Sequence, residues 1–134
     1  AAGGAAPMPV PLLAWYRRLG LPINEGYGLT ENLAVSNLTL PGQNMEGTVG
    51  PAYPGVEIRI DLTSGEIQMR SPALMQGYYK DPAQTAQTFT SDGWLRTGDK
   101  GTLDADGCLH ITGRVKDIFK TSKGKYVVPA PIED

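Results

Sequence analysis

Residues 56–70 have the sequence VEIRIDLTSGEIQMR, in which apolar side chains occupy every second position on both sides of the turn Thr63-Ser64-Gly65. Successive side chains of a strand point to opposite faces of a sheet, so this alternation is typical of strands that are buried on one face. The short turn sequence joins the two alternating runs without a long connection. The stretch therefore predicts a β-hairpin of two half-buried strands.

A second hairpin is predicted later in the chain. The turn sequence Asp104-Ala105-Asp106-Gly107 connects residues 101–103 to residues 108–112. The chain also contains 17 glycines and 11 prolines, a composition that favours many short strands and tight turns. We therefore expect a mainly β fold with flanking α/β material and short helices, in which residues 47–112 form a small distorted β-barrel.

Two short helices are also predicted. Residues 12–19 carry apolar side chains at helical spacing, and residues 22–28 after them are typical of an extended strand. The predicted buried face of this first helix consists of Leu12, Trp15, Tyr16 and Leu19. In the second helix, Asp81 is suited to cap the free amides and Pro82 is suited to the first position. We expect this helix to run for about two turns, over residues 82–89.

The composition excludes several classes of function. Twelve Lys and Arg against 14 Asp and Glu give a net charge of −2, so no basic field is available for a nucleic-acid partner. An apolar fraction of 40% in 134 residues is compatible with a globular domain. Cys108 is the single cysteine, which favours a cytoplasmic location without disulfides. The apolar runs are too short for a spanning helix, so we expect no transmembrane segment.

Three short segments carry the residue types that a nucleotide site needs. They are GYGLTE at residues 26–31, GWLRTGD at residues 93–99 and GRVKD at residues 113–117. The glycines of the first segment allow the backbone to approach a ligand, and Glu31 offers the hard anionic oxygen that Mg²⁺ prefers. Taken alone, that segment is a glycine-rich surface turn with an exposed carboxylate. Its order with the two downstream segments favours a nucleotide site.

Asp99 and Arg114 have polar groups that suit a sugar. The carboxylate of Asp99 follows an extended segment and can accept hydrogen bonds from two vicinal ribose hydroxyls. The guanidinium of Arg114 stays charged and can donate to ribose or phosphate oxygens. The alternatives are a turn dipeptide at Gly98-Asp99 and a surface salt bridge at Arg114. We interpret Asp99 as a functional residue.

The three segments, followed by KTSKGK at residues 120–125, resemble in their order the adenylate-forming (AMP-binding) superfamily of acyl-CoA synthetases and related ligases. The resemblance spans nearly all of the chain. VVPAPIE at residues 127–133 is similar to the long-chain fatty acyl-CoA synthetase branch. Members of this family are several times longer, so the resemblance implies that the chain is an internal fragment of a parent protein.

The resemblance assigns roles to individual residues. It implies a catalytic role for Thr30 and Glu31, with Glu31 also helping to hold Mg²⁺, and it implies that Tyr27 lies against adenine. The implied nucleotide-binding residues are Gly4, Ala5, Ala6, Gly26, Tyr27, Gly28, Thr30, Asp99 and Arg114. The resemblance implies that Lys116 is the hinge of a mobile C-terminal domain. It also implies that Lys123 and Gly124 belong to the loop that approaches nucleotide or CoA. Tyr78 and Tyr79 match a segment that caps the barrel, where we expect them to pack in the core.

The implied parent is an acid–thiol ligase of the long-chain fatty acid–CoA type. Its reaction would convert a fatty acid, ATP and CoA to acyl-CoA, AMP and pyrophosphate through an acyl-adenylate, with Mg²⁺ as cofactor. In that parent we expect residues 1–46 to end the large N-terminal portion and residues 47–112 to form the barrel subdomain. Residues 113–134 would contain the hinge and the start of a truncated C-terminal domain.

The partners of the chain would then be small molecules and the rest of the parent, in the cytoplasm or peripheral to a membrane. The phosphate loop and the catalytic lysine of such enzymes are absent from these residues, so we expect the fragment alone to be inactive. Two alternatives stay open. The parent could pass its acyl group to a carrier protein, or the chain could be a non-catalytic nucleotide-binding or interaction module.

Overall fold

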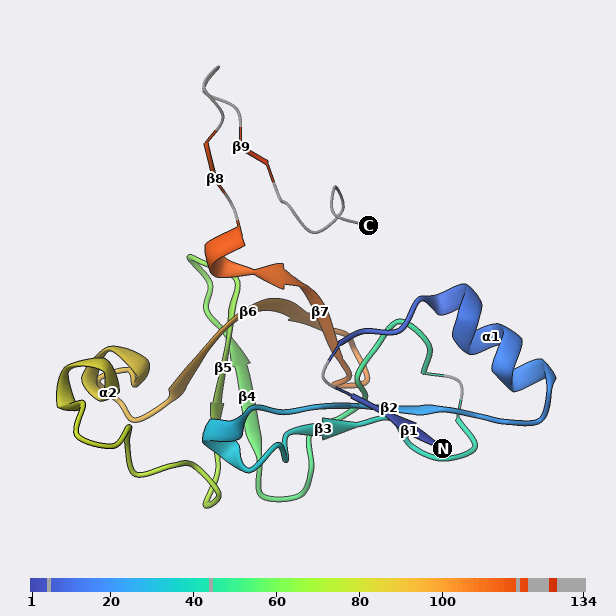
Figure 1. The fold of residues 1–134 in the computed structure, drawn as a ribbon, viewed down its shortest axis with the longest axis horizontal. Helices are drawn as coiled ribbons and strands as arrows, with labels where there is room; N and C mark the ends of the chain where they lie inside the picture. Colours follow the sequence, from blue (N-terminus) through green and yellow to red (C-terminus); the bar gives the residue numbers. More distant parts are fainter. Residues whose placement is uncertain (5, 44, 118, 121–125, 128–134) are drawn as a thin grey trace.

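The computed structural model describes residues 1–134 except 5, 44, 118, 121–125 and 128–134. In chain order its elements are β1 (Ala2–Gly3), α1 (Val10–Arg18), β2 (Asn24–Tyr27), the 3₁₀ helix η1 (Thr30–Asn32), β3 (Asn37–Leu38), β4 (Glu57–Ile60), β5 (Glu66–Arg70), α2 (Pro82–Thr88), β6 (Leu95–Leu103), β7 (Leu109–Arg114), the 3₁₀ helix η2 (Val115–Asp117), β8 (Phe119–Lys120) and β9 (Tyr126–Val127). The two α-helices lie at opposite ends of the molecule, with the strands of two sheets between them (Figure 1).

An antiparallel sheet in the order β4-β5-β6-β7 forms the body of the molecule. Both predicted hairpins are confirmed, since β4 pairs with β5 and β6 pairs with β7. The register shifts between Glu66 and Gln68 and again between Lys100 and Gly101. Irregularities of this kind bend a strand and increase its twist. The sheet therefore curls into a half-barrel, which confirms the mainly β fold class.

Strand β5 corrects one prediction. Ile67 and Met69 are fully buried, as the alternation predicts, but Glu66 and Gln68 on the opposite face are also only 7% and 3% exposed. The prediction of a half-buried strand is therefore wrong for β5. Side chains from the neighbouring strands contact its polar face: Arg59 Nε donates to Gln68 Oε1 at 2.7 Å, and Arg96 Nη1 lies 3.7 Å from Glu66 Oε2.

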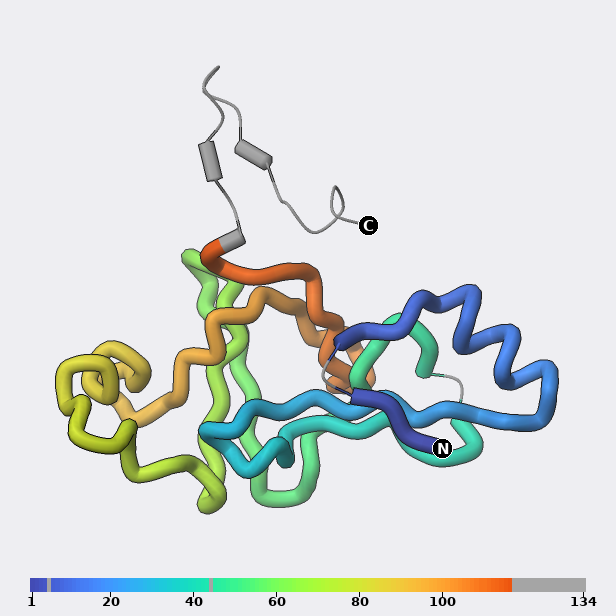
Figure 2. The backbone as a smooth tube through the Cα atoms, in the orientation of Figure 1, coloured from blue at the N-terminus to red at the C-terminus, as the bar shows by residue number. Residues whose placement is uncertain are grey.

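The main apolar core lies where the sheet meets the segment before β4. Val49, Ile67 and Leu109 are buried together, and Tyr27 packs against them. The amide of Val49 donates to the carbonyl of Leu109 at 2.9 Å, and the amide of Leu109 donates to that of Gly50 at 3.0 Å. Figure 2 shows this segment, drawn in blue-green, next to the orange strand β7. The core thus fixes Tyr27 relative to the large sheet.

A smaller sheet brings the N-terminal residues into the structure. β1 pairs with β2 in parallel, and β2 pairs with β3 antiparallel. β2 confirms the extended segment that we predicted over residues 22–28. Gly26 lies opposite Leu38 in this sheet. The pairing places Gly3 and Gly4 beside the segment that ends in Tyr27.

The second predicted helix is confirmed, and the first is only partly correct. Asp81 Oδ1 accepts the amide hydrogen of Gln84 at 3.1 Å, as expected of a capping residue of α2. In α1 the buried residue is Leu13, whereas most of the predicted apolar face, including Trp15, is exposed. Leu13 faces a cleft that it lines together with Ile23 of the following segment. The helical period was correct, but it could not show which side of the helix would meet that segment.

The start of β6 is attached to the first hairpin through an aromatic ring. The guanidinium carbons of Arg59 and Arg70 lie over the ring of Trp94, 4.4 Å and 4.7 Å from its centroid. Arg59 Nη1 also pairs with Asp92 Oδ2 at 2.8 Å, and this hydrogen bond holds the pKa of Asp92 well below its usual range. These contacts fix the strand that carries Asp99.

None of the helices in the described part of the chain combines the length and apolar character that crossing a bilayer requires.

Candidate functional site

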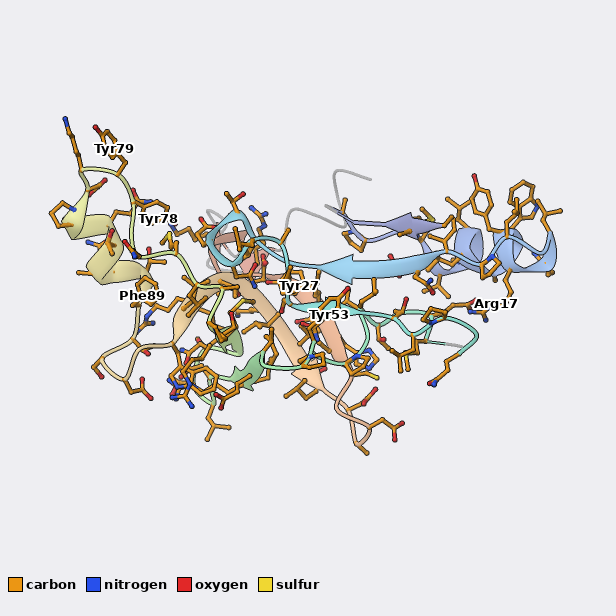
Figure 3. All side chains as sticks on the ribbon, turned by 90° about the horizontal axis from the view of Figure 1, so that it is seen from below. Arg17, Tyr27, Tyr53, Tyr78, Tyr79 and Phe89 are labelled. Atoms are coloured by element: carbon orange, nitrogen blue, oxygen red, sulfur yellow. The ribbon has the colours of Figure 1, made fainter. Side chains whose placement is uncertain are left out.

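A hydrogen bond between Tyr27 and Asp99 joins the small sheet to the large one. Tyr27 is the last residue of β2, and Asp99 lies in the middle of β6. Tyr27 Oη donates to Asp99 Oδ2 at 2.7 Å, across a sequence separation of 72 residues. Figure 3 shows Tyr27 near the centre of the molecule, between the two ends at which the helices lie. Two of the predicted nucleotide-binding residues are therefore in direct contact.

Arg114 completes this cluster from the neighbouring strand. Asp99 of β6 lies opposite Arg114 of β7 in the antiparallel register, and Arg114 Nε is 3.4 Å from Asp99 Oδ1. The side chain of Asp99 is 13% exposed, whereas that of Arg114 is 71% exposed. The carboxylate is thus held in place, while the guanidinium stays free to turn toward a ligand. A pair of this exposure adds little stability by itself.

The environment of Tyr27 keeps its hydroxyl protonated. Burial raises the pKa of Tyr27, and the hydrogen bond to Asp99 and the charge of Asp99 raise it further, because each disfavours a phenolate. Thr97 and Arg114 act in the opposite direction but are outweighed. The phenol therefore acts as a neutral hydrogen-bond donor to an anionic acceptor. This arrangement leaves Asp99 with further lone pairs that can accept hydrogen bonds.

Glu31 lies in a second set of contacts. Its Oε1 accepts a hydrogen bond from Tyr78 Oη at 2.8 Å, and its carbonyl oxygen accepts the amide hydrogen of Met75 at 2.7 Å. The hydrogen bond to Glu31 is the largest cause that raises the pKa of Tyr78. The contacts of Glu31 thus run to the segment before α2, whereas those of Asp99 run to β2 and β7.

Tyr78 is a residue of the site that the sequence analysis missed. We expected Tyr78 and Tyr79 to pack in the core, and this is wrong for Tyr79, which is 87% exposed. Figure 3 shows Tyr79 projecting from one end of the molecule. Tyr78 is partly buried and holds Glu31. A Tyr-Tyr pair between Gly77 and a capped helix signals an ordered segment, but it does not indicate which ring turns inward.

The glycines of the first segment serve the chain itself. A Cβ atom at Gly28 would lie 2.3 Å from the carbonyl carbon of Ala34. Position 28 therefore requires a glycine, because the backbone that follows η1 lies against it. A Cβ atom at Gly26 would lie 3.4 Å from Leu38 and 3.9 Å from the carbonyl oxygen of Gly3. One at Gly4 would lie 3.7 Å from the carbonyl oxygen of Gly26. Gly4 and Gly26 therefore lie side by side, and their part in a nucleotide site stays a prediction.

The remaining predicted residues are not brought into this cluster by any contact found in the described part of the chain. Thr30 is exposed at the start of η1, and Ala6 is exposed near the N-terminus. Lys116 is exposed in η2, directly after β7. The predictions for Ala5, and for the loop residues Lys123 and Gly124, lie outside the described residues.

The described residues contain no group of three or more His, Cys, Asp and Glu side chains that could hold a metal by themselves. Mg²⁺ often keeps several waters and is bound through one or two carboxylates together with substrate phosphates. The single carboxylate of Glu31 fits that kind of site, since Tyr78 occupies one oxygen and a second oxygen remains.

The fold and the sequence together define the class of protein. The family model described as AMP-binding enzyme matches residues 1–79, which include β2 and η1. The chain belongs to this family.

Its relatives include ligases of long-chain fatty acids. The chain is 42% identical over 134 residues to the long-chain-fatty-acid–CoA ligase FadD15 of Mycobacterium tuberculosis (strain ATCC 25618 / H37Rv), covering 100% of this chain and 22% of the relative. It is 41% identical over 142 aligned positions to long-chain-fatty-acid–CoA ligase 1 of Homo sapiens, covering 98% of this chain and 20% of the relative. The resemblance to the long-chain branch is thus confirmed, and the chain spans about a fifth of the length of these curated relatives.

Solved structures of a related enzyme support the same assignment. O-succinylbenzoate coenzyme A synthetase (MenE) of Bacillus subtilis, in complex with ATP and a magnesium ion, matches with a TM-score of 0.84 and 32% identity. This match covers 98% of our chain and 30% of MenE. The complex of MenE with its acyl-adenylate intermediate matches with a TM-score of 0.86 and 32% identity, covering 98% and 29%. The chain therefore has the fold of a segment of an adenylate-forming enzyme.

Proposed function

We propose that the protein to which these residues belong is an acid–thiol ligase that activates a fatty acid with ATP and transfers the acyl group to CoA. The fatty-acid carboxylate attacks the α-phosphorus of ATP and releases pyrophosphate, which gives an acyl-adenylate. The thiol of CoA then attacks the acyl carbon, loses its proton and releases AMP. The long-chain ligases among the relatives support the substrate class, and the MenE complexes support the adenylate step.

The observation that carries this proposal is the contact of Tyr27, Asp99 and Arg114 across two sheets. Asp99 would accept hydrogen bonds from the ribose hydroxyls, and Arg114 would turn toward ribose or phosphate oxygens. Tyr27 would offer its ring to the base while its hydroxyl holds Asp99. A fixed carboxylate of this kind needs no reorganisation when the sugar arrives, which favours binding of the nucleotide in one orientation.

We assign Glu31 to the Mg²⁺ that accompanies ATP, and Thr30 to the phosphates. Both residues lie in η1, four residues or fewer after Tyr27 in sequence, so one short segment would contact both base and phosphate. Bound Mg²⁺ would neutralise the charge on the phosphates during adenylation. The hydrogen bond from Tyr78 limits the directions in which the Glu31 carboxylate can point.

The function is tested by nucleotide titration of the whole protein with Asp99→Ala. We expect the affinity for ATP to fall at least about tenfold, because the sugar loses its charged acceptor. Asp106→Ala is the matched control, since Asp106 is an exposed aspartate in the turn between β6 and β7. Unchanged ATP affinity in Asp99→Ala, with Asp106→Ala also unchanged, would remove the carboxylate from the site and contradict the proposal.

The acceptor of the acyl group is tested separately. Pyrophosphate release by the whole protein, measured with a fatty acid in the presence and absence of CoA, should continue over many turnovers only with CoA. Turnover that requires a carrier protein instead would indicate the alternative ligase type. Absence of any pyrophosphate release would favour a non-catalytic nucleotide-binding module. We expect the 134 residues by themselves to form no thioester, and a cytoplasmic location stays a prediction.

A further inference from the structure

Strand β6 contains a bulge that includes Asp99. Gln68 of β5 pairs with Arg96, and Glu66 pairs with Lys100, so β6 uses three residues, Thr97 to Asp99, where β5 uses one, Ile67. The backbone of Gly98 has a φ of +78°, in the left-handed region that favours glycine. A bulge changes the direction in which side chains of the bulged strand point. The direction of Asp99 is therefore set by the conformation of this bulge.

Two side chains hold the bulge in place. Thr97 Oγ1 donates to the carbonyl oxygen of Ile67 at 2.7 Å and accepts the amide hydrogen of Asp99 at 3.1 Å. Glu66 Oε1 accepts the amide hydrogen of Gly98 at 3.0 Å. The Gly98 amide thus has a side chain as its acceptor at the point where the regular strand pairing is interrupted.

Glu66 is unusual for a charged residue of this sheet because it is buried. It is 7% exposed, and its second carboxylate oxygen lies 3.7 Å from Arg96 Nη1. Glu57, one strand away, is instead exposed and pairs with Arg70 at 3.0 Å. Burial of a carboxylate is costly unless donors satisfy it. The amide of Gly98 and the guanidinium of Arg96 supply the donor and the opposite charge.

We propose that Glu66 is a positioning residue for Asp99, whose carboxylate it aims by holding the amide of Gly98 and with it the bulge in β6. This inference rests on the proposed function, because Glu66 would hold in position the Asp99 carboxylate that binds the ribose in that function. Glu66 lies outside the three motif segments, and it touches no substrate in this role. Its effect on nucleotide binding passes through the backbone of Gly98 to Asp99, and from Asp99 to the ribose hydroxyls.

The test compares ATP with 2′,3′-dideoxy-ATP, which lacks both ribose hydroxyls. Affinities of the whole protein for the two nucleotides are measured for Glu66→Leu, which removes the acceptor, and Glu66→Gln, which keeps an acceptor oxygen. We expect Glu66→Leu to lower the affinity for ATP about tenfold and to leave the affinity for dideoxy-ATP unchanged. Only ATP has the ribose hydroxyls that bind the carboxylate of Asp99, which Glu66 positions. Glu66→Gln should restore most of the preference for ATP. Glu57→Leu, which removes an exposed carboxylate of the same hairpin, should leave both affinities unchanged.

If Glu66 had a purely structural role, Glu66→Leu would lower the affinities for both nucleotides equally, and that result would overturn the proposal. Glu66→Asp covers the case in which Glu66→Leu does not fold, because it keeps the charge but withdraws the acceptor from Gly98. Loss of the ATP preference in Glu66→Asp would support the proposal, and full retention would overturn it. Asp99→Ala separates this result from the proposed function. If Asp99→Ala loses the preference for ATP and no Glu66 variant does, only the role of Glu66 fails.

Discussion

Asp99, the proposed acceptor for the ribose hydroxyls, accepts a hydrogen bond from a tyrosine instead of being left to solvent. The phenol of Tyr27 is a donor that stays neutral, because burial and the nearby negative charge both raise its pKa. A neutral donor fixes the carboxylate without cancelling its charge. The cluster therefore keeps an anionic acceptor that is already oriented.

This pKa shift predicts a pH dependence of stability. The pKa of Tyr27 is raised in the folded protein above its ordinary value of 10.0, so the folded state holds this proton more tightly than the unfolded chain. The contribution of the hydroxyl to stability is then fully present below pH 10 and is lost as the pH rises from about 10 toward the higher folded pKa. Tyr27→Phe has no such proton. We expect the difference in melting temperature between wild type and Tyr27→Phe to be constant from pH 7 to about 9 and to shrink above pH 10.

Comparing the two proteins cancels the titration of other groups, which they share. A melting-temperature difference that stays constant through pH 11 would contradict the raised pKa. A melting-temperature difference of zero at every pH would indicate that Tyr27 contributes its ring alone.

At this scale the sequence indicates which residues are charged or aromatic, but not what lies opposite them. Gly26 and Gly28 look equivalent in the segment GYGLTE, and we interpreted both as residues that approach a ligand. Gly28 is required because the backbone of Ala34 lies against it, after Leu33 and Ala34 adopt left-handed conformations. A contact of that kind depends on the path of the chain after the motif. No pattern inside the motif could predict it.

Among the elements, those whose pairing is local were predictable. The hairpin β4–β5 follows from alternation around a short turn, and α2 follows from Asp81 and Pro82 at its start. The burial of β5 on both faces and the buried side of α1 were not predictable, because both depend on how separate elements pack against one another and not on a pattern within one element. The buried position of Glu66 belongs to this second kind, and so does its contact with the bulge of β6.

The segment between β5 and α2 is attached to η1 through Tyr78 and Glu31, and this attachment gives a prediction. In Tyr78→Phe the carboxylate of Glu31 loses the donor that orients it, so more of its conformational freedom must be lost when Mg²⁺ binds. We expect the Mg²⁺ concentration for half-maximal pyrophosphate release at saturating ATP to rise at least about threefold.

Tyr79→Phe is the matched control, since it removes the same atom from the neighbouring, exposed ring. This variant should behave as the wild type. Equal Mg²⁺ dependence in both variants would show that Tyr78 only packs against η1 and does not orient a metal ligand.

In the molecule as a whole, the candidate site is assembled from strands that are far apart in the chain. β2 supplies Tyr27, β6 supplies Asp99 and β7 supplies Arg114. The order of the motif segments predicted these residues through a family resemblance, whereas their convergence depends on the curl of the large sheet and on the packing of Tyr27 against the core. The division into residues 1–46, 47–112 and 113–134 stays a prediction. Lys116, just after Arg114, lies where the third part would begin to move.

A hinge at Lys116 can be tested through its backbone rather than its charge. Proline fixes φ near −65° and lacks an amide hydrogen, and the first turn of a 3₁₀ helix such as η2 tolerates both features. Lys116→Pro should therefore be compatible with the present conformation and should oppose a large change in φ. If the C-terminal part swings about this residue between adenylation and thioester formation, one half-reaction should become at least about tenfold slower while the other changes less than about twofold.

Lys116→Ala removes the same charge and keeps the backbone free, so both half-reactions should proceed nearly as in the wild type. Equal effects of the two substitutions, or equal slowing of both half-reactions by proline, would place the moving point elsewhere in the chain.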